Sequence, residues 1–171
     1  FNLLLCGLLF LVIIIEIFMP FFVGLIAPGF VDNSEKIKLA IDLTRITFPF
    51  LILISLSSFF AAILNSHNKF AVASAAPIIL NLVLIGVLLF SNYLNDSLVY
   101  YLSYGVSISG FLQFVFLYKF VKKYYTLNFS FNFTFNNKVK FFFKKLLPSI
   151  FSSGVTQINI LIGTIIASFQ A

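Results

Sequence analysis

Long apolar runs separated by short polar linkers make up the whole chain. Each run exceeds the ~18 residues that suggest a membrane-spanning helix, because a helix rising ~1.5 Å per residue needs about 20 residues to cross a ~30 Å hydrocarbon core. The runs end at helix-stopping residues such as Pro28-Gly29. The pattern predicts an all-α fold, a polytopic integral membrane helical bundle whose five transmembrane spans cover about residues 3–27, 39–64, 70–90, 98–121 and 143–169.

The composition supports the membrane class and excludes a soluble domain. Hydrophobic residues make up 61% of the 171 residues and charged residues 9%, whereas a soluble domain carries ~25% charged residues. No basic leader follows Phe1, so the first run does not resemble a signal peptide. We therefore expect a partial membrane domain of a larger protein, with further helices of the same chain before and after residues 1–171.

The lysines divide the linkers between the two sides of the membrane. The linkers after the first and third runs hold two lysines, and those after the second and fourth runs hold eight. The positive-inside rule therefore places residues 65–69 and 119–145, which include the basic linker 122–142, in the cytoplasm, and residues 28–38 and 91–97 outside. The net charge of +6 is then a topology signal, and we expect no nucleic-acid partner. The eight lysines are Lys69, Lys119, Lys122, Lys123, Lys138, Lys140, Lys144 and Lys145.

One part of the basic linker has a different pattern. Residues 126–137, "TLNFSFNFTFNN", alternate aromatic and polar side chains with the period of a strand. The segment is either a short hairpin arm or a stretch lying on the lipid headgroups with its Phe side chains in the bilayer. The flanking lysines favour the second interpretation, since each attracts anionic lipid by roughly 1 kcal/mol near the surface. Membrane lipids are therefore an expected partner.

Polar and small residues recur at helical spacing inside every span. At ~100° per residue, spacings of three and four place such residues on one stripe of a helix, and bulky residues occupy the opposite face. The stripes are Glu16, Pro20 and Ala27; Ser55, Ser58, Ala62 and Asn65; Ser74, Pro77 and Asn81; Ser103, Ser107 and Gly110; and Ser149, Ser152, Thr156, Asn159 and Gly163.

Two interpretations of the stripes remain open. Small and hydroxyl residues let helices pack closely and hydrogen-bond to one another, for about 0.6–2 kcal/mol each. Alternatively, the stripes line a polar cavity along a transport path, and prolines bend the helices around it. The substrate-cavity candidates are Arg45, Glu16, Ser55, Asn65, Asn81, Ser152, Thr156 and Asn159, and the expected kinks are at Pro20, Pro49 and Pro77.

Two of these candidates carry charge inside or at the edge of a span. A carboxylate in hydrocarbon costs ~2.5 kcal/mol or more, so Glu16 is expected to face a partner or water, or to be protonated in a helix contact. Arg45 lies near the outer boundary of the second span. Its side chain either reaches the headgroups or points into a cavity as an anion site, where its planar guanidinium suits phosphate.

The residues that usually carry catalysis are sparse. Cys6 is the single cysteine and His67 the single histidine, so the sequence predicts no disulfide and no metal cluster. Cys6 is interpreted as a small buried hydrophobe and His67 as an interfacial residue. There is no paired-carboxylate motif, so we expect neither an enzyme nor a bound cofactor.

Several short motifs follow one another along the chain. They are "APGF" at 27–30, "RITFPF" at 45–50, "ILN" at 63–65, "NKF" at 68–70 and "APIILN" at 76–81, and then "LLPSIFSSGVTQINILIGTIIASF" at 146–169. This order resembles the MurJ/MviN family, the lipid II flippases of the MOP exporter superfamily. The resemblance is colinear over almost the whole chain. It departs from the family at Ala61-Ala62, where many members have Gly, and at 126–137, which match only in length and place.

The resemblance implies that the five spans are helices three to seven of about fourteen, in one lobe of a larger MOP-type transporter of the bacterial cytoplasmic (inner) membrane. It implies movement of lipid II, the undecaprenyl-diphosphate-linked disaccharide-pentapeptide, from the inner to the outer leaflet by alternating access. The family's main substrate cations lie in helices outside residues 1–171, so none is carried over; Arg45 matches only a basic position of the family motif.

Three other functions stay open at this point. Another MOP exporter, either a polysaccharide repeat-unit flippase or a multidrug antiporter, would share the stripes but lack the "APGF" and "RITFPF" set. A small multispan structural protein is disfavoured by Glu16, Arg45 and the three prolines in the first three spans. An integral-membrane enzyme is the least favoured, because the usual catalytic groups are missing.

Overall fold

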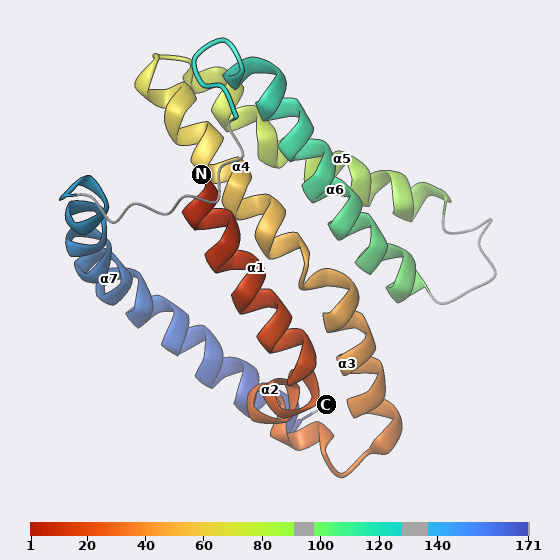
Figure 1. The fold of residues 1–171 in the computed structure, drawn as a ribbon. Helices are drawn as coiled ribbons and strands as arrows, with labels where there is room; N and C mark the ends of the chain where they lie inside the picture. The colour runs from red at the N-terminus through yellow and green to blue at the C-terminus, as the bar shows by residue number, and fades with distance from the viewer. Residues whose placement is uncertain (91–97, 128–136, 171) are drawn as a thin grey trace. The chain divides into compact units, whose positions relative to one another are not determined.

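The computed structural model describes residues 1–90, 98–127 and 137–170, which form helices joined by turns (Figure 1). The prediction of an all-α fold is confirmed for this part of the chain. Contacts divide the chain into two compact units, Phe1–Met19 with Ile41–Phe129 and Pro20–Ala40 with Ser130–Ala171. The helices are α1 (Asn2–Ile17), α2 (Met19–Ile26), the 3-10 turn η1 (Pro28–Phe30), α3 (Ser34–Thr47), α4 (Phe50–Ser66), α5 (Phe70–Phe90), α6 (Leu98–Val121) and α7 (Asn137–Ser168).

The described helices fit the expectation of a protein that crosses a membrane several times. Four stretches are long and apolar enough to span a bilayer, and a fifth is added if α1 and α2 are taken as one broken span. The bilayer limits of each span and the sides of the linkers stay predictions. The four stretches are Ser34–Ser66, Phe70–Phe90, Leu98–Val121 and Lys144–Ser168.

The first unit is held together by α4, α5 and α6, which lie side by side, with α1 along α4 (Figure 1). Phe60 is fully buried, and the rings of Phe1, Phe114 and Tyr118 lie 5.8, 5.2 and 5.9 Å from its ring centre. Buried aromatic pairs at such distances contribute ~0.5–1.5 kcal/mol each beyond the area that they bury. The centre of this unit is therefore an aromatic cluster at the contact of α4 with α1 and α6.

Small residues allow α6 to approach its neighbours. A Cβ atom on Gly110 would lie 2.5 Å from a ring carbon of Phe50 and 3.2 Å from the Cβ of Leu53, both on α4. On another side of α6, a Cβ on Gly105 would lie 3.2 Å from Val87 of α5. These glycines set the interhelical distances, as small residues do in membrane helix pairs.

The helix starts and breaks have local causes. Asn33 begins α3, because its side-chain oxygen accepts hydrogen bonds from the backbone N–H groups of Glu35 and Lys36, each at 3.1 Å. This cap starts the helix at Ser34, ahead of the span expected from residue 39. Pro49 lacks a backbone N–H and stands where α3 ends and α4 begins.

The other expected kinks are at Pro20 and Pro77. Pro20 is the second residue of α2, just after the break at Phe18 that ends α1. Pro77 lies inside α5, which continues through it as one helix. The role of these prolines as bends in a moving transporter stays a prediction.

A tight turn joins α4 to α5 at Asn68. The N–H of Lys69 donates to the carbonyl of Leu64 at 2.9 Å, and the N–H of Asn68 donates to that of Asn65 at 3.0 Å. Asn68 has a φ of 57°, so the turn has the hydrogen bonds and the left-handed residue of a Schellman motif. Asparagine tolerates this conformation better than most residues with a Cβ.

We expect Asn68→Val to lower the free energy of unfolding by about 1–2 kcal/mol, because a β-branched residue is strained in the left-handed region. Asn68→Gly should leave the stability unchanged or raise it slightly. Ser74→Val, at an exposed helical position of α5, serves as the control for adding a branched side chain. Thermal unfolding of the complete gene product in detergent measures all three, and equal stability of the Val and Gly variants at 68 would contradict the prediction.

In the second unit, η1 packs against the C-terminal end of α7. The backbone N–H of Gly29 donates to the Ser168 hydroxyl at 3.1 Å, and that hydroxyl lies 2.7 Å from the carbonyl of Ile165. A Cβ on Gly29 would overlap the backbone carbonyl of Ser168. The glycine at 29 is therefore required by the close approach of two backbones.

Two sequence predictions fall partly on residues that the structure does not describe. Most of the alternating segment 126–137 lies outside the described residues, as does the whole linker 91–97. The last part of the basic linker 122–142 is helical, because α7 begins at Asn137. The hairpin and headgroup interpretations of 126–137 both stay open.

Candidate functional site

The charged candidates Glu16 and Arg45 lie near each other in the first unit. Glu16 is on the last turn of α1 and half-buried, and Arg45 is on the last turn of α3 and exposed. One carboxyl oxygen of Glu16, Oε1, is buried without a hydrogen-bond partner. The Arg45 guanidinium is close enough for its charge to act on this carboxyl group. We refer to these two residues as the Glu16–Arg45 pair, and the Glu16 Oε1 atom is left able to accept a hydrogen bond from a further polar group.

A hydrogen bond stabilises the chain just before the Pro49 break. The Ser107 hydroxyl on α6 donates to the carbonyl of Ile46 on α3 at 2.5 Å. The missing N–H of a proline disrupts the helical hydrogen bonds around it, so carbonyls near the break need other donors. Ser107 supplies one such donor, and its acceptor, Ile46, is the residue after Arg45 in the chain.

A small, mostly apolar cavity with two buried polar side chains in its wall lies among α4, α5 and α6. Its volume is about 90 Å³, enough for a few waters, since one water needs ~10–15 Å³ on this measure. Ser57 and Gln113 line it, each 1% exposed, and neither Ser57 Oγ nor Gln113 Nε2 has a hydrogen-bond partner among the protein atoms. Both groups can therefore bind water or another polar group. The other lining residues are Ile54, Ser58, Ala61, Ala73, Ala76, Pro77 and Leu117.

Sequence analysis missed Ser57 and Gln113. Ser57 was passed over because Ser55 and Ser58 defined the expected stripe of its helix. Gln113 carries a signal that could have found it, since an amide inside an apolar run is costly unless it is partnered. Its buried position next to Pro77 depends on how α5 and α6 pack, which no local pattern reveals.

The other candidates are spread over the two units. Ser55 is half-buried on α4, whereas Asn65 on α4 and Asn81 on α5 are exposed. On α7, Thr156 and Asn159 are exposed, and the side chain of Ser152 is outside what the structure describes. Among the described side chains, no hydrogen bond joins any two of the candidates. Their place on a shared cavity stays a prediction.

The stripe on α6 has a clear place in the structure. Ser103 and Gly110 are buried, and Ser107 binds the chain before the Pro49 break. This stripe therefore lies in helix–helix contacts, which fits the packing interpretation for this span.

The described residues offer little for covalent chemistry or metal binding. Cys6 is a free, half-buried cysteine. No group of three His, Cys, Asp or Glu side chains in the described ranges could hold a metal ion. The site residues can bind polar or charged groups through hydrogen bonds and electrostatic attraction.

Comparison with known proteins identifies the group to which this chain is similar. The model of the family described as "Lipid II flippase MurJ" matches residues 1–171. The "Probable lipid II flippase MurJ" of Rickettsia prowazekii (strain Madrid E) is 40% identical over 170 residues, which cover 99% of this chain and 33% of that protein. That of Rhizobium tropici is 38% identical over 172 residues, covering 98% of this chain and 32% of its own length.

A more distant relative has the same description. The "Lipid II flippase MurJ" of Burkholderia cenocepacia is 29% identical over 147 residues, 84% of this chain and 28% of that protein. The chain spans about a third of the length of the Rickettsia and Rhizobium relatives.

Proposed function

This chain belongs to the lipid II flippase MurJ family, and from that premise we propose that it is part of a transporter that moves lipid II across a membrane. The substrate is an undecaprenyl-diphosphate-linked disaccharide-pentapeptide, carried from the inner to the outer leaflet by alternating access. The transporter lies in the bacterial cytoplasmic (inner) membrane. The observation that carries the proposal is the match of the family model to every residue from 1 to 171.

The chemistry of the described residues supports transport without covalent change of the substrate. A carrier must offer hydrogen bonds and charge to a diphosphate-sugar headgroup inside a low-dielectric protein, and helices must present apolar faces to lipid. The Glu16–Arg45 pair supplies a cation and an unsatisfied carboxyl oxygen. In this proposal Arg45, Glu16, Ser55, Asn65, Asn81, Ser152, Thr156 and Asn159 face the passage.

A different exporter of the same superfamily is the runner-up. It would share multispan helices and polar stripes, but the match of the flippase family model to residues 1–171 disfavours it. The two functions differ in what the complete gene restores. A lipid II flippase restores growth and lipid II translocation in cells depleted of their own flippase, whereas a polysaccharide or drug exporter does not.

We expect Arg45→Ala and Asn159→Leu, made in the complete gene, to lower lipid II translocation by about tenfold each in depleted cells, a loss of ~1.4 kcal/mol. The physical reason is that each removes a polar contact in a passage where water cannot fully replace it. The measurement is the fraction of lipid II that an impermeant reagent reaches at the outer surface. Lys38→Ala, an exposed basic residue on α3, is the matched control and should behave as the unaltered gene.

Two outcomes would count against these proposals separately. Wild-type translocation by both variants, at equal protein levels, would remove Arg45 and Asn159 from the passage. Failure of the unaltered complete gene to restore translocation would contradict the flippase function itself.

A further inference from the structure

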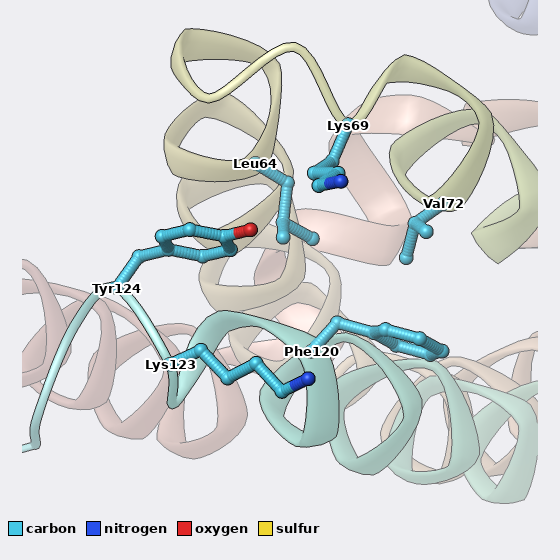
Figure 2. Close-up of a pocket in the computed structure, with 6 residues that line it drawn as sticks. All are labelled: Leu64, Lys69, Val72, Phe120, Lys123 and Tyr124. Atoms are coloured by element: carbon cyan, nitrogen blue, oxygen red, sulfur yellow. The ribbon is translucent and has the colours of Figure 1, made fainter.

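A second pocket lies at the end of the first unit where the α4–α5 turn meets the end of α6 (Figure 2). Its volume is about 270 Å³, a little below the ~300–1,000 Å³ of sites for drug-sized ligands. We name it the lysine pocket. It is lined by Leu64, Lys69, Val72, Phe120, Lys123 and Tyr124.

The turn at Asn68 places one of the two lysines. Because the Schellman bonds tie the Lys69 backbone to Leu64, Lys69 stands just before the first residue of α5. Lys123 follows the last residue of α6 by two positions. Figure 2 shows Lys69 coming from the α4–α5 turn and Lys123 from the end of α6, with the side chain of Leu64 between them.

Tyr124 completes the polar wall. Its ring is stacked on His67, with ring centres 4.2 Å apart and planes 17° apart. In Figure 2 the Tyr124 hydroxyl is turned toward Leu64, on the side of the lysines. A phenol O–H held in this way can donate a hydrogen bond to an anion beside the two ammonium groups.

The positive charges around the pocket favour an anionic ligand. Both lysines are exposed. From residue 43 to residue 171 the sequence contains one acidic residue, Asp96, which lies outside the described residues. The free N–H groups of the first turn of α5 add partial positive charge at the same place, and that turn contains no acidic residue. The lining of the pocket therefore offers two cations and a hydroxyl, and it contains no carboxylate.

The floor of the pocket indicates which kind of anion fits. Val72 and Phe120 present apolar surface beside the lysines, and the fully buried Leu64 lies behind that surface. A free inorganic phosphate has no apolar part to place there, whereas a lipid has glycerol and acyl carbons next to its phosphate. The pocket also lies at ends of helices that are long enough to span a membrane, the level at which headgroups and amphipathic side chains meet.

We propose that the lysine pocket binds the phosphate group of an anionic membrane phospholipid, with Lys69, Lys123 and the Tyr124 hydroxyl on the phosphate and Val72 and Phe120 against the adjoining carbons. Lysine binds phosphate as a compact point charge, and basic pockets between transmembrane helices bind acidic lipid headgroups. This site is separate from the Glu16–Arg45 pair, and its test measures the binding of phospholipid and not the translocation of lipid II, so the two proposals can fail separately.

The test uses the complete gene product, stripped of lipid in detergent and titrated with phosphatidylglycerol or phosphatidylcholine, with bound lipids counted by native mass spectrometry. We expect K69A/K123A to weaken the tightest phosphatidylglycerol binding about tenfold or more, and K69R/K123R to keep it within about threefold. Phosphatidylcholine binding should not change. K140A/K144A removes two exposed lysines of the same basic linker region and should match the unaltered protein.

Three results would overturn the proposal. The first is equal loss of phosphatidylglycerol binding in K69A/K123A and K140A/K144A, which would reveal only general attraction to positive charge. The second is full displacement of the lipid by inorganic phosphate at an equal concentration, which would identify a free-phosphate site. The third is a drop in the melting temperature of lipid-free K69A/K123A beyond that of the control, with unchanged lipid binding, which would show that the lysines pair with the protein itself.

Discussion

Gly29→Val should destabilise the second unit more than any other single change considered for it. A Cβ atom at this position overlaps the backbone carbonyl of Ser168, and backbone cannot move aside as a flexible side chain can. Overpacking of this kind costs ~1–3 kcal/mol, occasionally more, and the displaced turn also loses the hydrogen bond from Gly29 to Ser168, worth about 1 kcal/mol. We therefore expect a total loss of about 2–4 kcal/mol, visible as a lower melting temperature of the complete gene product and a smaller yield of folded protein.

Two further variants test the same contact if Gly29→Val gives no folded protein. Ser168→Ala removes the hydroxyl without a clash, so it should cost about 1 kcal/mol and leave the fold intact. Gly163→Ala, on the same helix α7 with open space around its Cβ, should be neutral or stabilising by up to ~1 kcal/mol. A Gly29→Val protein as stable as Gly163→Ala would mean that η1 and α7 do not pack in this way.

Gly110→Val should separate α6 from α4 in the first unit. The new side chain meets the Phe50 ring and the Leu53 Cβ, and the latter is fixed to the backbone of α4. A shift of α6 would also lengthen the Ser107–Ile46 hydrogen bond near the Pro49 break. We expect a loss of about 1–3 kcal/mol of folding free energy, measured by thermal unfolding.

The contact with Phe50 allows a direct check of the cause. Gly110→Ala adds only the Cβ, and combining it with Phe50→Leu removes the ring that this atom meets. The two changes should therefore be non-additive by more than about 0.5 kcal/mol, as expected for residues in contact. Gly86→Ala on α5, where nothing lies within 4 Å of the added atom, is the control. Strict additivity of Gly110→Ala and Phe50→Leu would contradict the close approach of α6 and α4.

The described contacts assign two of the sequence signals to packing. The "APGF" turn and the "ASF" end of the last span were separate motifs in the sequence, yet Gly29 of one donates a hydrogen bond to Ser168 of the other. In the Ser103–Ser107–Gly110 stripe, Ser107 bonds to α3, Gly110 lies against α4 and Ser103 is buried. The spacing of these residues cannot distinguish a stripe used for helix packing from one that lines a cavity, because both place small polar residues on one helix face.

The candidate site was only partly accessible to sequence reasoning. Glu16 and Arg45 stood out because charge in an apolar run is costly, and the structure places them near enough to interact. Ser57 and Gln113 were missed, although they are among the most deeply buried polar side chains of the described residues. The lysine pocket was also missed, since the lysines were read as a topology signal and their convergence depends on the Asn68 turn.

The sequence by itself determined that this is an all-α protein of several membrane-crossing helices and to which family it belongs. These properties follow from hydropathy, helical period and short motifs, which are carried by residues close together in the chain. Only the tertiary structure decided which small residues are contact points, which polar groups are buried without partners, and which lysines line one pocket. Those properties depend on residues far apart in the sequence, as in the pairing of Gly29 with a residue 139 positions away. Patterns of neighbouring residues do not reveal which distant residues come into contact.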